Sequence, residues 1–122
     1  MLKKNIVNLY EGGKCKASET GTLPYLEVHL LESKKNIPAV IIFPGGGYRQ
    51  RAEHEGEYIA KEFNSYGFHA FVLHYRVSPH FYPAPFLDAI SGILHVKKNI
   101  DKYGIKENSI AVCGFSAGGH LA

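Results

Sequence analysis

Two short apolar segments each end abruptly in a glycine-rich turn, and this pattern constrains the fold more than any other feature of the sequence. Residues 39–43 are continuously apolar and rich in β-branched side chains, and residues 110–113 form a second apolar run. Strands without polar side chains are typical of a sheet that helices cover on both faces. Glycines end a strand in a sharp turn because they tolerate backbone conformations that other residues avoid. We therefore expect two buried parallel strands, each followed by a glycine turn.

The segments around these strands show extended and helical patterns in alternation. Residues 26–30 alternate apolar with polar side chains, which predicts a half-exposed strand, and residues 68–75 predict another buried strand. Residues 55–66 predict a helix that ends at Gly67 in a left-handed cap. The expected inner face of this helix carries Tyr58, Ile59, Phe63 and Tyr66.

The clearest helical pattern begins at Pro85 and closes at Gly104. Its expected apolar face carries Phe86, Ile90, Ile93, Leu94 and Ile100. Strands that alternate with helices form parallel crossovers, so we predict an α/β fold with a mostly parallel sheet and helices on both faces. A single domain is expected over residues 1–122. Both glycine turns then lie at the carboxyl edge of the sheet, where active sites of such folds are found.

Composition excludes several classes of function. The 14 Lys and Arg residues are spread among 11 Asp and Glu residues, so we expect no nucleic-acid partner. No apolar run has the length of a signal peptide or a membrane span, so we expect no membrane partner. Cys15 and Cys113 are interpreted as two free thiols, which predicts a cytoplasmic protein. No cysteine cluster or paired-histidine spacing indicates a metal, and no cofactor is expected.

Ser116 stands at the centre of a Gly-x-Ser-x-Gly motif directly after the second apolar strand. A serine hydroxyl becomes nucleophilic when a sharp strand-to-helix turn exposes it and a histidine takes its proton. Gly114 and Gly118 occupy positions where a side chain would collide with the neighbouring turn, and the backbone N–H of Ala117 can stabilise an oxyanion. The alternative is a serine that only caps the following helix. We predict Ser116 as the catalytic nucleophile.

The turn at residues 44–48, Pro-Gly-Gly-Gly-Tyr, is the second candidate element. Consecutive glycines let backbone N–H groups approach a developing negative charge without intervening side chains. We predict Gly46 and Gly47, in preference to Gly45, as oxyanion-hole donors. The alternatives are a flexible connection and a phosphate loop, but the turn lacks the glycine spacing and the Lys-Ser/Thr pair of phosphate-binding motifs.

The order and spacing of these motifs resemble the N-terminal half of an α/β-hydrolase of the esterase and lipase group. The similarity begins near residue 39 and includes the turn at 44–48, the segments Tyr-Arg-Val-Ser-Pro at 75–79 and Tyr-Pro-Ala-Pro at 82–85, and the elbow at 114–121. The chain looks most like the small acetyl-esterase and acetyl-xylan-esterase-like hydrolases. The resemblance implies an α/β-hydrolase sheet truncated after the elbow.

Two features depart from the related sequences. Lipase-like motifs carry a histidine before the glycines, where Pro44 stands here, so the hydrogen bonds that order the turn must come from elsewhere. The family triad runs Ser, then Asp or Glu, then His, and no residue after His120 supplies either partner. The resemblance therefore assigns the triad Asp and His to a C-terminal half outside this sequence.

The histidines and charged residues present in the chain have structural interpretations. We expect His120 to pack or to form a hydrogen bond beneath the elbow, and His74 to be a satisfied core histidine. Asp88 is expected to stabilise its helix or support the Tyr75-Arg76 turn, with Arg76 as a partner for its carboxylate. The remaining candidates show no partner pattern: His54, His69, His80 and His95.

These observations predict a serine hydrolase that cleaves small carboxylic esters, of acetyl type and including carbohydrate esters, through an acyl-enzyme. Two alternatives stay open: a catalytically silent domain that acts by association, and hydrolysis of amide, formamide or peptide bonds. The expected partner is a small-molecule ester. An apolar strand at a sheet edge leaves backbone groups unpaired, which predicts association into a homo-oligomer, aggregation, or recruitment of the other half.

Overall fold

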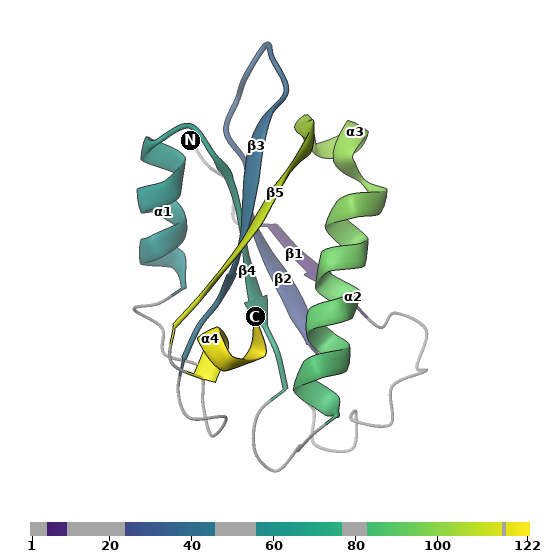
Figure 1. Cartoon of the computed structure of the whole chain (residues 1–122). Coiled ribbons are helices and arrows are strands. Elements are labelled where there is room, and N and C mark those ends of the chain that lie inside the picture. Colours follow the sequence, from purple (N-terminus) through teal and green to yellow (C-terminus); the bar gives the residue numbers. More distant parts are fainter. Residues whose placement is uncertain (1–4, 10–23, 46–55, 77–82, 116) are drawn as a thin grey trace.

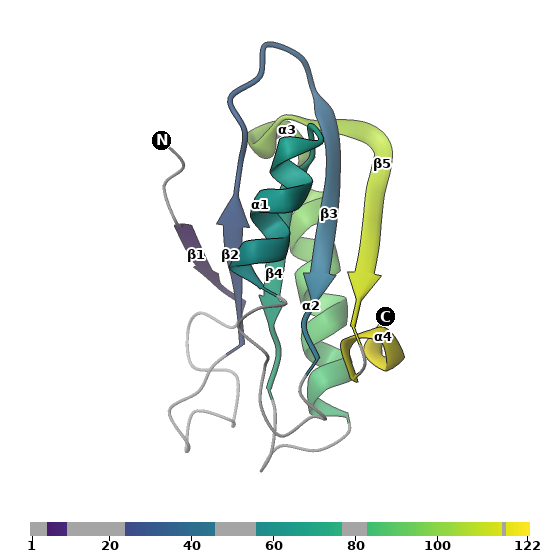
Figure 2. The same cartoon turned by 90° about the vertical axis from the view of Figure 1, so that its left-hand side faces the viewer.

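The computed structural model describes residues 5–9, 24–45, 56–76, 83–115 and 117–122. Five strands form one sheet in the order β1-β2-β4-β3-β5. Their bounds are β1 Asn5–Asn8, β2 Tyr25–His29, β3 Ile37–Phe43, β4 His69–His74 and β5 Ile105–Gly114. Strands β4, β3 and β5 are parallel, whereas β1 and β2 join the sheet in antiparallel pairing (Figure 2). The predicted α/β class is confirmed, with a mixed sheet whose parallel part carries the two glycine turns.

Helices lie on both faces of this sheet, as the sequence predicts (Figure 1). Helix α1, Glu57–Ser65, covers one face, where Ala60 packs with alternate side chains of β3 and β4. Helix α2, Ala84–Lys98, covers the other face together with the short helix α3, Ile100–Tyr103. Helix α4, Ala117–Leu121, follows β5 directly. Alternate residues of β3 therefore enter two separate hydrophobic clusters, which explains why this strand has no polar side chain.

The predicted inner face of α2 is only partly correct, since Ile93 packs against the core as expected, as does Ile100 of α3. Phe86, Ile90 and Leu94 are exposed, and the side facing the sheet carries the smaller residues Ala89, Gly92 and Val96. The reason is the distance between the helix and the sheet. A Cβ atom added to Gly92 would lie 3.1 Å from Cδ1 of Leu73, so the large side chains do not fit between helix and sheet.

Two further details of the helices differ from expectation. The helical pattern up to Gly104 is interrupted at Asn99, whose side-chain amide donates to the carbonyl of His95 at 2.7 Å. Such a local side-chain bond competes with helix continuation. In α1, Tyr58 and Tyr66 are exposed, while Ile59 and Phe63 pack inward as predicted. The predicted positive φ of the capping glycines is confirmed at Gly67 and Gly104.

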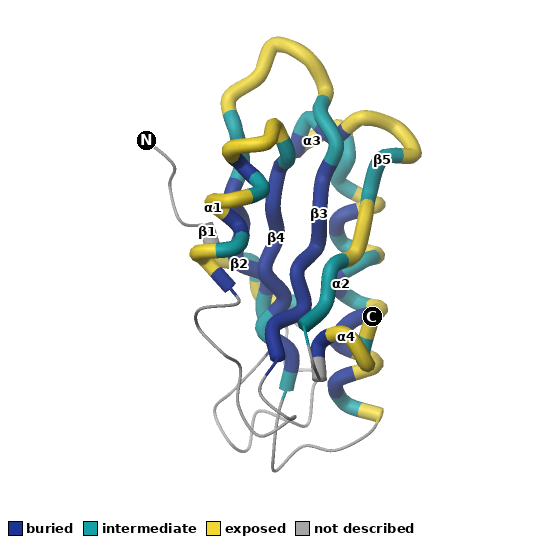
Figure 3. Tube along the Cα trace, turned by 60° about the vertical axis from the view of Figure 1, so that its left-hand side comes forward, coloured by how far each residue is buried: buried dark blue, intermediate teal, exposed yellow. Residues whose placement is uncertain are grey.

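Strand β5 lies at the edge of the described sheet and is less buried than its sequence predicts. Figure 3 shows β3 and β4 as a buried centre beside a partly exposed β5. Val112 is 40% exposed, although an apolar run was expected to be covered on both faces. The expectation that the strand before Ser116 forms a sheet edge is confirmed.

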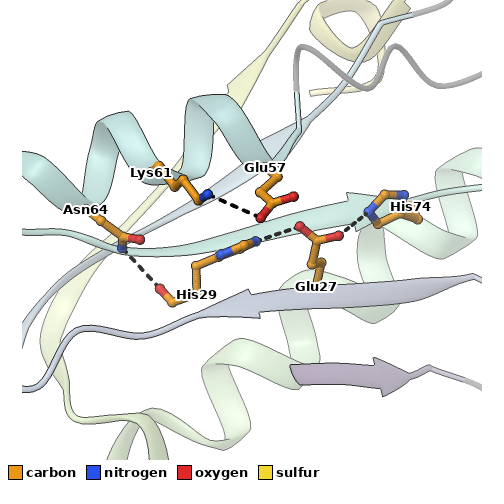
Figure 4. Close-up of polar contacts among 6 residues, drawn as sticks. All are labelled: Glu27, His29, Glu57, Lys61, Asn64 and His74. Carbon is orange, nitrogen blue, oxygen red and sulfur yellow. Dashed lines mark hydrogen bonds and ion pairs between the residues drawn. The ribbon is translucent and has the colours of Figure 1, made fainter. Parts of the chain in front are cut away.

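Strand β2 is more buried than the predicted half-exposed strand. Its polar residues Glu27 and His29 are 4% and 3% exposed because they face α1, whose Asn64 amide donates to the carbonyl of His29 (Figure 4). The Nε2 atom of His29 lies 2.6 Å from Oε2 of Glu27, and Nε2 of His74 lies 3.4 Å from Oε1. The hydrogen bond from His29, assisted by His74, holds the pKa of Glu27 well below its usual range. The alternation of apolar and polar side chains on β2 thus corresponds to two buried faces, one apolar and one polar.

We expect Glu27→Gln to reduce the dependence of stability on acid pH. In the wild type, the unfolded chain takes up a proton near the ordinary carboxyl pKa of 4.5 while folded Glu27 stays ionised, so stability declines as pH falls through this value. The Gln side chain cannot titrate, so its urea midpoint should change less between about pH 6 and pH 3. The matched control is Glu62→Gln on the exposed side of α1, which should retain the wild-type slope. Equal slopes for all three proteins would contradict this assignment.

Candidate active site

The carboxyl ends of β3 and β5 lie side by side, at the edge of the sheet that the sequence predicts. The parallel register pairs Phe43 with Gly114, the last residue of each strand. The backbone N–H of Phe115 then donates to the carbonyl of Phe43 at 3.1 Å, beyond the regular ladder. Helix α4 follows at the same end of the sheet (Figure 2). Parallel pairing therefore brings together the start of the glycine turn and the start of the elbow.

Close backbone approach explains why both flanking positions of the elbow are glycines. A Cβ atom at Gly114 would lie 2.6 Å from the backbone nitrogen of Gly119. A Cβ atom at Gly118 would overlap the carbonyl of Phe43 and lie 2.7 Å from the carbonyl oxygen of Pro44. Real Cβ atoms do not approach backbone atoms so closely, so the first turn of α4 requires glycine at these positions. The predicted collision at Gly114 and Gly118 is confirmed.

The catalytic residues predicted from the sequence are only partly within the described structure. Ser116, Gly46 and Gly47 lie outside the described residues, so their roles stay predictions. Ala117 is the first residue of α4, at the position where a helix presents free backbone N–H groups. The structure thus brings together the residues that flank the predicted nucleophile and the predicted oxyanion turn.

Tyr75 connects the end of β4 to the base of the glycine turn. Its side chain is fully buried, and its hydroxyl donates a hydrogen bond to the carbonyl oxygen of Pro44, 31 residues away in the sequence. Pro44 and Gly45 are also buried. Sequence reasoning assigned no role to this hydroxyl. The sequence feature that could have indicated this role is the position of Tyr75, directly after a buried strand and at the start of the motif at 75–79.

A buried ion pair fixes the residue after Tyr75. The Asp88 carboxylate is fully buried in α2 and accepts from the backbone N–H of Arg76 at 2.7 Å. The guanidinium of Arg76 reaches the same carboxylate, with Nη2 2.9 Å from Oδ1 and Nε 3.0 Å from Oδ2. One carboxylate therefore binds both the main chain and the side chain of Arg76. The structural interpretation of Asp88 and Arg76 is confirmed.

The described histidines that pack inside the fold bind structural partners. His69 bonds the N–H of Leu31 and the carbonyl of Gly104, and burial lowers its pKa. His95 lies 2.7 Å from the hydroxyl of Tyr103, and burial also lowers the pKa of this histidine. His54 and His80 are outside the described residues. His120 is exposed on α4, so the expectation that it packs beneath the elbow is wrong. His74 is half-buried and stacks on Tyr25 with ring centroids 4.3 Å apart, but its Nε2 has no hydrogen-bond partner among the described residues, so the prediction of a satisfied core histidine is only partly correct.

Neither a metal centre nor a membrane span is found within the described ranges. No three His, Cys, Asp or Glu side chains there are grouped so that they could hold a metal ion. None of the helices in that part of the chain has the length and apolar character to cross a bilayer.

Comparison with known protein families agrees with this geometry. The family model described as BD-FAE matches residues 26–122, which include all of β2 except its first residue and every described element that follows it. The chain belongs to the BD-FAE family.

Relatives of this BD-FAE chain are named as esterases and hydrolases. It is 31% identical to an acetylxylan esterase of Xylanibacter ruminicola, over 98% of this chain and 23% of the relative. The crystal structure of an acetyl ester-xyloside bifunctional hydrolase from Caldicellulosiruptor lactoaceticus is 43% identical, with a TM-score of 0.94 over 98% of this chain and 45% of that chain. An α/β-hydrolase from a Medee basin deep-sea metagenome library is 33% identical, with a TM-score of 0.83 over 98% and 49% of the two chains. The chain thus has the α/β-hydrolase fold and spans less than half of each relative.

We expect Gly118→Ala to destabilise the BD-FAE chain because the new methyl group overlaps main-chain carbonyls that cannot rotate away. Overpacking of this kind lowers the free energy of unfolding by about 1–3 kcal/mol. Gly119→Ala is the matched control, since its Cβ would meet its nearest neighbour, the carbonyl oxygen of Gly114, at 3.4 Å, an ordinary contact distance. This control should be neutral or slightly stabilising because alanine favours a helix. Urea unfolding measures both effects, and equal stability of the two variants would disprove the close approach.

We expect Asp88→Asn to lower stability by about 3 kcal/mol, because the change removes the negative charge that balances the largely buried Arg76 guanidinium. The matched control is Glu57→Gln, which breaks the exposed pair between Glu57 and Lys61 on α1. Exposed pairs four residues apart on a helix contribute only about 0.3–0.5 kcal/mol. Urea unfolding at neutral pH compares the two. A loss for Asp88→Asn no greater than that of the control would contradict a structural role for the buried pair.

Proposed function

We propose that this chain carries the nucleophile and the oxyanion hole of a serine hydrolase that cleaves small carboxylic esters. The observation that carries the proposal is the fit of α4 onto the end of β3, where Gly118 meets the carbonyls of Phe43 and Pro44. This contact supports a nucleophile elbow directly beside a glycine turn. The names of the acetylxylan esterase and of the acetyl ester-xyloside hydrolase support acetyl-type esters, including carbohydrate esters, as the substrate class.

In the proposed reaction, the Ser116 hydroxyl attacks the ester carbonyl while a histidine takes its proton. The carbonyl oxygen gains a negative charge, which the N–H groups of Ala117, Gly46 and Gly47 stabilise. The intermediate then expels the alcohol, which receives the proton back from the histidine, and leaves an acyl group on Ser116. Attack by water repeats these steps and releases the carboxylic acid and free Ser116.

The proposed base histidine and its orienting carboxylate come from the part of an α/β-hydrolase that follows the elbow. The family order of Ser, Asp or Glu, and His supports this assignment. The partners of the described histidines agree with it, since His69 and His95 are bonded to Gly104 and Tyr103 at the opposite end of the sheet from α4 (Figure 1). Such a reaction needs no metal or cofactor, and the proposed partner is a small-molecule ester.

A cytoplasmic location is also part of the proposal. Its support is Cys113, whose thiol is free and partly buried in β5, where burial raises its pKa. We also propose that the protein forms a homo-oligomer in which β5 takes part in the contact. The exposure of Val112 on this strand supports it.

Ser116→Ala should abolish ester hydrolysis in a full-length protein that carries this sequence. Loss of a triad serine lowers kcat by about 10⁴-fold or more because no nucleophile remains. The assay uses nitrophenyl acetate, and a fluorophosphonate probe with mass spectrometry should label Ser116 in the wild type. The matched control is Ser109→Ala in the middle of β5, which removes only a local bond to the carbonyl of Glu107. An active Ser116→Ala variant, or label on another residue, would refute the nucleophile.

The 122-residue chain by itself should be inactive on nitrophenyl acetate. Activity of this chain that Ser116→Ala abolishes would show that its base lies among the residues present. A nitroanilide of the same acyl group tests the amide alternative. Cleavage of the nitroanilide without cleavage of the ester would overturn the proposed substrate class.

A further inference from the structure

The hydroxyl of Tyr75 lies where three segments of the site edge meet. It follows β4, and it donates a hydrogen bond to the carbonyl oxygen of Pro44, which follows β3. The same oxygen would lie 2.7 Å from a Cβ atom on Gly118, in the helix that follows β5. One carbonyl group is therefore bonded on one side by Tyr75 and approached on another by the elbow helix.

We propose that Tyr75 is the positioning residue of the oxyanion turn: its hydroxyl holds the Pro44 carbonyl and thereby fixes the peptide unit between Pro44 and Gly45 from which the turn begins. This inference rests on the proposed function of that turn. Tyr75 does not touch substrate in this proposal and acts only through Pro44.

Planarity of the peptide bond transmits the effect of this hydrogen bond. The Pro44 carbonyl and the N–H of Gly45 belong to one planar trans unit and point in nearly opposite directions. Holding the oxygen therefore fixes the direction of the Gly45 N–H at the start of the turn. Oxyanion donors act only when they are already directed at the developing charge. A turn of free glycines would lose this direction because glycine restricts its backbone least.

The sequence around the turn leaves this task to a residue from elsewhere in the chain. Pro44 has neither a backbone N–H nor a polar side chain, so it cannot anchor the turn through its own donors. Tyr75 is suited to do so because its ring is fully buried in the α2-side core. The adjacent Arg76 is fixed by Asp88 through its backbone and its side chain. The donor is thus held rigid by the core and by the ion pair.

The test is Tyr75→Phe in a full-length protein that carries this sequence, compared with Tyr103→Phe. The control also loses a buried tyrosine hydroxyl from the same core, one that bonds His95 at 2.7 Å, but on α3 at the opposite end of the sheet (Figure 1). For nitrophenyl acetate, we expect kcat of Tyr75→Phe to fall by about 10–100-fold with a KM within about two-fold of wild type, because misdirected donors weaken only transition-state binding. The control should keep kcat within about two-fold.

Melting curves separate this effect from simple destabilisation, since both variants lose one buried hydrogen bond. Similar melting temperatures with a fall in kcat only for Tyr75→Phe would support positioning. An equal fall in both variants would show a general effect of stability and overturn the proposal. A raised KM with unchanged kcat would overturn it as well, because that pattern indicates a role in ground-state binding.

Hydrogen exchange of the amides that follow Pro44 tests the same role without activity. We expect these amides to exchange at least about three-fold faster in Tyr75→Phe and at the wild-type rate in Tyr103→Phe. Unchanged exchange in Tyr75→Phe would overturn the positioning role even if the enzyme is active. If the wild type lacks esterase activity, the proposed function fails, and exchange alone decides whether Tyr75 holds the turn.

A second variant serves if Tyr75→Phe does not fold. Tyr75→4-aminophenylalanine keeps a weaker N–H donor at the same position and should fold. Its kcat should be about three- to ten-fold below wild type because the bond to Pro44 is weakened and not lost. A wild-type kcat together with wild-type exchange of the turn would count against the proposal.

Discussion

The contact between the backbone of α4 and the last carbonyls of β3 is the constraint on which the site edge depends. There is no room for a side chain at Gly118, because a Cβ atom there would overlap the carbonyl of Phe43. This approach requires β3 and β5 to be parallel neighbours with Phe43 opposite Gly114. The helix that follows β5 can then begin only against the turn that follows β3. The contact between α4 and β3 thus requires this strand order, this register and both glycines.

Buried polar groups hold the neighbouring strand in place at the same edge. Asp88 binds the main chain and the guanidinium of Arg76 directly after β4, and Tyr75 binds the carbonyl of Pro44. Burial of a charged pair adds little net stability because both charges lose their hydration. Its directional bonds nevertheless allow a single position for the strand end. On the other face of the sheet, Glu27 and His29 form a comparable buried pair beneath α1.

Much of the fold and part of the candidate site could be predicted from the sequence. The strand β3, the two helices that cover the sheet and the steric need for Gly114 and Gly118 are local consequences of side-chain pattern and backbone geometry. The depth of burial was predicted less well. Alternation on β2 indicated exposure, but α1 covers Glu27, and the pattern cannot distinguish water from a buried ionic partner. For α2, the largest apolar residues suggested the wrong face because Gly92 and Ala89 allow closer approach to the sheet.

The sequence by itself determined where the chain turns, where strands and helices form and which motif carries the candidate nucleophile, because these depend on residues within a few positions of one another. The three-dimensional packing was needed to establish which face of α2 is buried, that Glu27 and His29 are buried, and that Tyr75 bonds Pro44. These features join residues distant in the sequence, and they depend on how closely the elements pack. Packing distance is set by the sum of many contacts across the sheet, which no local pattern contains.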